Sequence, residues 1–184
     1  MAISRYASPI GRLTIVTRGD LITQIRLNGQ EETPLEPEKH LSAENGASSG
    51  TQPLPKHLEV WLDRYFSGEK PDALPPLEFP LSTPFRAEVW AVLCRIPYGK
   101  LVTYGDISRF LECKTGRRVS ARAVGGAVRH NPIAVVVPCH RVVGSDGSLT
   151  GYAGGLEKKI ALLRLEGVDP DMLAADPKRY RFDL

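Results

Sequence analysis

The chain has 184 residues, of which 42% are hydrophobic and 24% are charged, and its formal net charge is +3 at pH 7. This length suits one ordinary domain or two small ones, and the composition excludes a disordered or fibrous chain. So small a surplus of positive charge does not by itself predict a nucleic-acid partner. The apolar runs are too short to predict a membrane span, and the first residues do not have the pattern expected of a secretory signal.

The N-terminal part of the sequence predicts strands, an exposed loop and one helix. Residues 3–28 combine short apolar runs with turn signals, which is typical of an antiparallel meander. Residues 30–55 are rich in Glu, Pro, Ser and Gly and indicate an exposed loop. Residues 55–68 have helical periodicity, and the apolar stripe of this helix consists of Leu58, Trp61, Leu62 and Tyr65. We therefore expect a strand-rich N-terminal domain over residues 1–83.

A proline-rich connection leads to a second domain, expected over residues 84–184. The stretch from residue 69 to residue 84 contains five prolines, which is typical of a linker between domains. A helix is then expected over residues 83–96, because a threonine followed by a proline favours a helix start. Cys94 falls among the apolar residues of this helix and is expected to be a core thiol.

Two further helices are expected over residues 104–111 and 120–130, joined by a basic connection at residues 114–118. Two short helices joined in this way resemble a helix-turn-helix. The sequence thus predicts an α/β fold of the α+β kind. A small strand-rich N-terminal α/β domain is joined to a mainly helical C-terminal domain that contains the helix-turn-helix.

The residues after this pair of helices begin with an Asn-Pro break. Residues 133–137 form a continuous apolar run, which is expected to be a buried extended segment. A glycine-rich loop follows over residues 144–155. The last helix is expected over residues 156–166, closed by Gly167, and the side chains expected to point inward are Leu156, Ile160 and Leu163.

Cys139 and His140 leave the apolar run together. A free thiol with a pKa of about 8.5 is only slightly ionised at neutral pH, so a nucleophilic cysteine needs a nearby base or a positive field. His140 cannot easily reach its neighbour's sulfur directly, but it could act through a water, and a carboxylate would orient it. The dipeptide alone fits a buried structural cysteine beside a surface histidine equally well.

The three cysteines of the chain are too few and too widely spaced for a disulfide framework or a four-ligand zinc site. Reduced thiols favour an intracellular protein, which would be cytoplasmic in a bacterium or archaeon and nuclear in a eukaryote.

The expected helix at residues 120–130 contains two adjacent glycines, each of which costs roughly 1 kcal/mol relative to alanine. A helix of such small residues lets another backbone approach closely. That backbone could belong to a neighbouring helix. It could also be DNA, with Arg122 and Arg129 projecting from the same helix, and the basic run before the helix favours DNA.

These residues together resemble the O6-alkylguanine-DNA alkyltransferases. The segment Val135–Val142, with the core Pro138-Cys139-His140-Arg141, resembles the active-site motif of that family. Its setting is similar as well, and the flanking matches are Arg122–Ala127, Asn131-Pro132, Gly151–Gly155 and Leu165–Gly167. The resemblance covers residues 84–167 in order, whereas the N-terminal half matches more loosely.

The resemblance implies a single-turnover alkyltransferase that repairs double-stranded DNA. Cys139 would take the alkyl group from the O6 of a flipped-out guanine, and from the O4 of alkylthymine, stoichiometrically and irreversibly. His140 would act as the base through a water, and Glu166 would hold His140. Asn131 would tie the helix-turn-helix to the active-site segment, and Tyr104 would donate to the guanine ring.

The resemblance also assigns residues that contact the DNA and the base. Arg122 would fill the gap left by the flipped base. The small residues Ser120, Ala121 and Gly125 would lie in the minor groove, and Arg129 of the same helix would also bind DNA. The pocket for the base and its alkyl group would involve Pro132, Val142, Tyr152, Ala153, Gly154 and Lys159. The family often has serine where Ala153 stands, so any side-chain contact there is lost.

Two departures from the family pattern stand out. The connection between Tyr104 and Arg122 is longer than usual. Residues 1–83 contain no cysteine, whereas some members bind zinc there, so we expect no metal and no cofactor. The protein is expected to be a monomer that does not bind membranes.

Two alternative functions can be set against this hypothesis. A Cys-His hydrolase would need an oxyanion hole. A non-enzymatic sensor of the alkyltransferase-like kind would lack the reactive cysteine.

Overall fold

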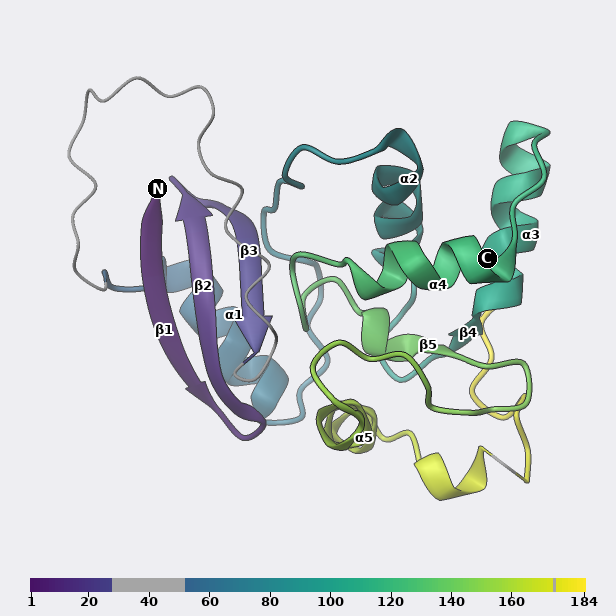
Figure 1. Cartoon of the computed structure of the whole chain (residues 1–184). Coiled ribbons are helices and arrows are strands. Elements are labelled where there is room, and N and C mark those ends of the chain that lie inside the picture. Colours follow the sequence, from purple (N-terminus) through teal and green to yellow (C-terminus); the bar gives the residue numbers. More distant parts are fainter. Residues whose placement is uncertain (28–51, 174) are drawn as a thin grey trace.

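The computed structural model describes residues 1–27, 52–173 and 175–184 (Figure 1). Three antiparallel strands open the chain in the order β1-β2-β3, as the meander predicted from the sequence requires, and they are β1 (Ala2–Ser8), β2 (Gly11–Arg18) and β3 (Leu21–Leu27). Helix α1 (Lys56–Phe66) lies behind the sheet in Figure 1. Residues 30–51 of the loop expected over residues 30–55 lie outside the described residues.

The face between sheet and helix is the first part of the hydrophobic core. Leu13 and Ile15 of β2 and Leu58 and Leu62 of α1 are all fully buried. Leu58 and Leu62 of the predicted stripe therefore share a core with the sheet, whereas Trp61 is only half-buried and Tyr65 packs in a second cluster with Val135 and Leu162.

The proline-rich connection is bonded to the sheet. The backbone N–H of Ile22 donates to the carbonyl of Pro76 at 3.0 Å, and the N–H of Glu78 donates to the carbonyl of Ile22 at 2.8 Å. Arg18 also forms an ion pair with Glu78. The connection thus runs beside β3, where these bonds satisfy backbone groups of that strand.

Helix α2 (Pro84–Leu93) starts where the sequence predicts, because the Thr83 side chain accepts from the N–H of Arg86 at 3.3 Å. The expected extension to residue 96 is wrong. After Leu93 the chain closes into a tighter turn, in which the N–H of Ile96 donates to the Leu93 carbonyl at 3.1 Å. Cys94 lies in this turn and is half-buried rather than a core thiol.

The helix-turn-helix consists of α3 (Tyr104–Thr115) and α4 (Ala121–Arg129). Helix α3 continues beyond the predicted end at residue 111 and includes the first two residues of the basic stretch, until Gly116 adopts the left-handed conformation that closes it (φ 68°). Helix α4 agrees with the prediction, with Ser120 as its N-cap. The longer connection expected between Tyr104 and Arg122 is thus largely helix.

The apolar run at residues 133–137 is buried as predicted, but it is not extended. The N–H of Val137 donates to the carbonyl of Ile133 at 3.0 Å, and Val135 has a φ of 71°. The run is therefore a tight turn. It leads into a 3-10 turn (Cys139–Arg141) and the short strand β5 (Val142–Val143), which pairs in parallel with β4 (Val102–Thr103).

Helix α5 (Leu156–Leu165) follows the glycine-rich loop. Its inward face was predicted incorrectly at its start. Leu156 is 51% exposed, and the side chains that helix α5 does bury are Lys159, Leu162 and Leu163. A short 3-10 helix (Pro170–Met172) follows, and the C-terminal tail returns to the start of β4, where the N–H of Phe182 donates to the Leu101 carbonyl at 2.8 Å.

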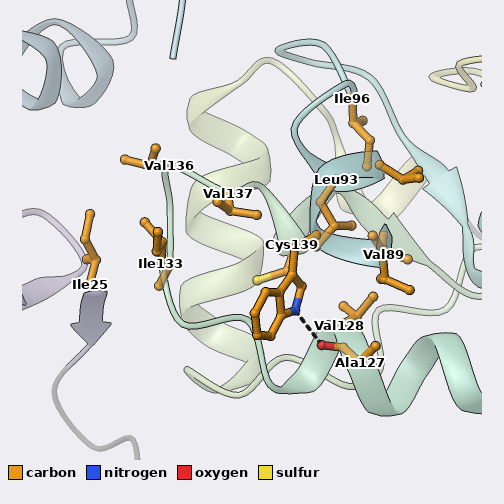
Figure 2. Packing of buried hydrophobic residues seen from close by; sticks show 14 of the residues in the cluster. Ile25, Val89, Leu93, Ile96, Ala127, Val128, Ile133, Val136, Val137 and Cys139 are labelled. Carbon is orange, nitrogen blue, oxygen red and sulfur yellow. Dashed lines mark hydrogen bonds between the residues drawn. The ribbon is translucent and has the colours of Figure 1, made fainter. Parts of the chain in front are cut away.

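One hydrophobic cluster runs through both halves of the molecule (Figure 2). Ile25 of β3 lies beside Ile133, and two backbone hydrogen bonds join strand β3 to residues 132–134. The N–H of Ile25 donates to the Pro132 carbonyl at 2.9 Å, and the N–H of Ala134 donates to the Ile25 carbonyl at 3.1 Å. Within the described ranges, no helix is long and apolar enough to cross a membrane.

Candidate active site

Cys139 sits at the margin of the core, in the same hydrophobic cluster as Val137 and Leu93, and is 9% exposed (Figure 2). Burial raises the pKa of its thiol above the ordinary value, although a hydrogen bond from Asn131 and the charge of Lys159 act in the opposite direction. Cys139 is therefore a thiol at neutral pH. Any reaction that uses its sulfur as a nucleophile needs a base to take the proton.

Asn131 connects the end of α4 to Cys139. Its side-chain amide donates to the Val137 carbonyl at 2.8 Å and to the Cys139 sulfur at 3.1 Å, and its side-chain oxygen accepts from the Ile133 N–H at 3.1 Å. These bonds hold the turn in which Val135 has a positive φ. They also fix the sulfur relative to the helix-turn-helix.

His140 is fully buried, so the alternative of a surface histidine does not hold. Its Nε2 is 2.7 Å from Oε1 of Glu166. Because a carboxylate only accepts, Nε2 carries the hydrogen and Nδ1 keeps a lone pair. Nδ1 is buried and has no hydrogen-bond partner within the described part of the chain. Burial lowers the pKa of His140 despite the opposing charge of Glu166, so the ring is neutral near pH 7 and can accept a proton.

Glu166 is the centre of a buried hydrogen-bond network. Besides His140, the donors to its carboxylate are Tyr65 Oη at 2.7 Å, Arg141 Nε and Nη2 both at 2.8 Å, and the N–H of Gly99 at 3.0 Å. Burial alone would raise the pKa of Glu166, but His140 and Arg141 together outweigh it and hold that pKa well below its ordinary range. Since His140 is neutral near pH 7, the bidentate Arg141 is the main reason why Glu166 is an anion.

Gly99 contributes to this network through its backbone. It has a φ of 70°, and a Cβ at this position would lie 2.9 Å from the Glu166 carbonyl oxygen. Only glycine therefore lets the turn at residues 97–100 approach the end of α5 closely enough for the N–H to reach the carboxylate.

Lys159 is buried beside the glycine-rich loop. Its ammonium donates to the Val142 carbonyl at 2.7 Å and to the Thr150 carbonyl at 3.2 Å, and Tyr104 Oη donates to the same Thr150 carbonyl at 3.1 Å. Burial lowers the pKa of Lys159 to about 8, against the opposing effect of Cys139. Lys159 thus closes the loop and places a positive charge near the sulfur.

The other predicted pocket residues lie around this loop. Tyr152 packs in one cluster with Tyr65 and Val135, and its buried hydroxyl has no hydrogen-bond partner in the described chain. Val142 is fully buried, Pro132 and Gly154 are half-buried, and Ala153 is exposed.

Helix α4 buries one face and exposes the other. Ala121, Arg122 and Arg129 are exposed, and the Ser120 hydroxyl accepts from the Ala123 N–H at 3.2 Å as a helix cap. The predicted Gly125 is half-buried, with the ring of Tyr104 3.8 Å from where its Cβ would lie, whereas no atom of the described residues would lie within 4 Å of a Cβ at Gly126. The bare stretch of the exposed face is therefore at Gly126, which follows Arg122 by one helical turn and which sequence reasoning did not name.

The structure thus brings together Cys139, His140, Glu166, Asn131 and Lys159, and it adds Arg141, Tyr65 and Gly99, which the sequence analysis did not select. Arg141 could have been found, because an arginine inside a buried motif needs a carboxylate partner. Tyr65 gave no such signal. Within the described ranges, His, Cys, Asp and Glu side chains do not gather in threes in a way that could hold a metal ion.

Comparisons with known proteins agree along the chain. The family model described as "6-O-methylguanine DNA methyltransferase, DNA binding domain" matches residues 84–168, and the corresponding ribonuclease-like domain matches residues 1–81. A methylated-DNA–protein-cysteine methyltransferase of Mycobacterium tuberculosis is 42% identical over 159 residues, covering 86% of this chain and 88% of the relative. One of Haemophilus influenzae is 38% identical over 164 residues, covering 89% and 84%.

Solved structures show the same likeness. The crystal structure of Mycobacterium tuberculosis OGT in complex with DNA has a TM-score of 0.73 and 35% identity and covers 96% of this chain and 100% of that one. The Mycobacterium tuberculosis O6-methylguanine methyltransferase has a TM-score of 0.71 and 38% identity, covering 90% and 92%.

Proposed function

Because this chain belongs to the 6-O-methylguanine DNA methyltransferase family and repairs DNA by transferring an alkyl group to a cysteine of its own, we propose that Cys139 is the acceptor and that His140, Glu166, Asn131 and Tyr104 assist it. The substrate is duplex DNA that carries O6-alkylguanine, and O4-alkylthymine is accepted as well. The protein acts as a monomer inside the cell, in the cytoplasm of a bacterium or archaeon and in the nucleus of a eukaryote.

The observation that carries this proposal is the buried relay behind the thiol, in which Glu166 fixes the Nε2–H of His140 and leaves Nδ1 as the proton acceptor. In the reaction, the Cys139 sulfur attacks the alkyl carbon in line with the carbon–O6 bond. A carbon–sulfur bond forms, and the electron pair of the broken bond stays on the guanine oxygen. The thiol proton passes to His140 Nδ1 through a water.

The departing guanine carries a negative charge, which a hydrogen-bond donor must stabilise. Tyr104 lies between α4 and the loop, and burial, followed by the electrostatic effect of Cys139, raises the pKa of its phenol. The phenol therefore stays protonated, and its hydrogen can turn from the Thr150 carbonyl to the departing guanine. The product on the protein is a thioether, whose sulfur is a poor leaving group, so each molecule reacts once.

The direct test is a single-turnover assay with duplex DNA that carries tritiated O6-methylguanine. We expect label on the peptide that contains Cys139, to a plateau of one equivalent per protein. Continued turnover beyond one equivalent, or label on another residue, contradicts the proposal.

Arg122 is proposed to enter the base stack and fill the gap of the flipped nucleotide. Arg122→Ala is expected to lower the transfer rate at saturating duplex by about ten- to hundredfold, since flipping costs a few kcal/mol. The rate with free O6-benzylguanine should stay unchanged. Arg129→Ala, at the other end of the same exposed face, should weaken DNA binding but leave the rate at saturation intact. Equal losses on duplex and free base would speak against the role of Arg122.

A further inference from the structure

Tyr65 places a phenol from the N-terminal half of the chain inside the relay. It lies on α1, is fully buried, and is separated from Glu166 by 101 positions in the sequence. Its hydroxyl donates to Glu166 Oε1 at 2.7 Å and lies 3.4 Å from Nε2 of His140. The phenol thus meets the same carboxylate oxygen that His140 uses.

The direction of this hydrogen bond follows from the charges. Glu166 is an anion that can only accept, so the phenol is the donor. Burial and the nearby Glu166 charge raise the pKa of Tyr65 well above its ordinary value, so the hydroxyl keeps its proton at neutral pH. Three donors, Tyr65 Oη, His140 Nε2 and Arg141 Nη2, therefore share Oε1.

Aromatic packing fixes the phenol in place. The ring of Tyr65 stacks on Trp61 with a centroid distance of 5.3 Å and an interplanar angle of 4°. It makes edge contacts with Phe66 at 5.2 Å and with Tyr98 at 6.0 Å. Tyr98 in turn donates to the Leu165 carbonyl at 2.9 Å, next to Glu166. The aromatic cluster holds both the donor and the segment that bears the acceptor.

We infer that Tyr65 is a positioning residue of the alkyl transfer, which holds the Glu166 carboxylate so that His140 presents Nδ1 toward Cys139. This inference rests on the proposed function. With this role for Tyr65, the N-terminal half is part of the active site, because helix α1 supplies a group that acts through Glu166 on His140, the general base. A phenol that shares Oε1 also draws negative charge away from His140, and so it keeps the imidazole less basic.

Tyr65→Phe removes the hydroxyl and keeps the ring. The charged groups facing His140 are then Arg141 of its own turn, Lys159 of α5 and Glu166, which follows the last residue of α5. We expect the single-turnover rate at neutral pH to fall about tenfold, the size of a lost hydrogen bond to a charged group. The acid limb of the pH–rate profile should move to higher pH, because Glu166 then stabilises the imidazolium more strongly.

The matched control is Tyr6→Phe, which removes another phenol–carboxylate bond to α1, from Tyr6 to Asp63 at 2.8 Å, away from the relay. It should leave the rate and the acid limb unchanged. Thermal unfolding checks that each variant folds, and 15N NMR of the His140 ring gives its pKa and tautomer without any activity measurement. That pKa should rise in Tyr65→Phe alone.

Wild-type protein that fails to transfer label refutes the proposed function itself. If the wild type transfers one equivalent and Tyr65→Phe keeps the wild-type rate, acid limb and His140 pKa, the positioning role is wrong. The role is also wrong if Tyr6→Phe shifts them equally, because the effect would then come from the stability of the N-terminal half.

Discussion

Cys139→Ser is expected to abolish alkyl transfer and to leave binding to damaged DNA intact. A serine hydroxyl at this position can still accept the hydrogen bond that Asn131 donates to the sulfur at 3.1 Å, so the turn keeps its shape. A neutral alcohol is a far weaker nucleophile than a thiol, and its proton is much harder to remove. Label transfer measures the first effect and fluorescence anisotropy of a labelled duplex measures the second.

Cys113→Ala is the control for this experiment, because Cys113 has an exposed thiol on α3 and takes no part in the relay. It should transfer one equivalent at the wild-type rate. Residual stoichiometric transfer by Cys139→Ser, or its loss in Cys113→Ala, would mean that the acceptor has been assigned to the wrong residue.

Glu166→Gln should damage both stability and activity. The amide cannot balance the buried Arg141 guanidinium, and loss of one partner of a buried ion pair costs about 3–5 kcal/mol. His140 also loses the anion that stabilises its protonated form, so the transfer rate should fall by about two to four orders of magnitude, the range of general-base catalysis. Chemical unfolding and single-turnover kinetics measure the two effects separately.

The pH dependence of stability gives an independent check on Glu166. Its pKa in the folded protein is depressed, so its contribution to stability is present above the unfolded-state pKa of about 4.3 and is lost as the pH falls below it. Glu166→Gln should flatten the acid side of the stability profile. Glu157→Gln, at an exposed position on the same helix, should resemble the wild type. If both variants lose equal stability, the buried network is not the cause.

Much of the fold could be predicted because its signals are local. The caps at Thr83 and Ser120, the stripe of α1 and the turns of the meander each follow from neighbouring residues. The run at residues 133–137 was mistaken for an extended segment because it is apolar throughout and contains neither glycine nor any other turn signal. Its turn depends on the Asn131 side chain, which bonds backbone groups on both sides of it.

The residues of the site can be divided in the same way, into those with a local signal in the sequence and those without one. Cys139 and His140 could be selected because the chemistry of a thiol and an imidazole is visible in the sequence. The inward face of α5 was misjudged because Lys159 is polar, yet it is buried with its ammonium on two carbonyls. Tyr65 could not be found, since an aromatic residue in an apolar stripe looks like core, and only the tertiary fold brings its hydroxyl to Glu166.

Strand β3 is bonded to the residues that precede Cys139 through Ile25, Pro132 and Ala134. In evolutionary terms this makes the two halves of the gene poor candidates for shuffling. In a recombinant that joins the first half of one relative to the second half of another, the edge of β3 must still fit the turn that comes from the other relative. A gene that lost the codons for residues 1–27 would encode a chain in which the turn before Cys139 lacks strand β3, to which it is bonded.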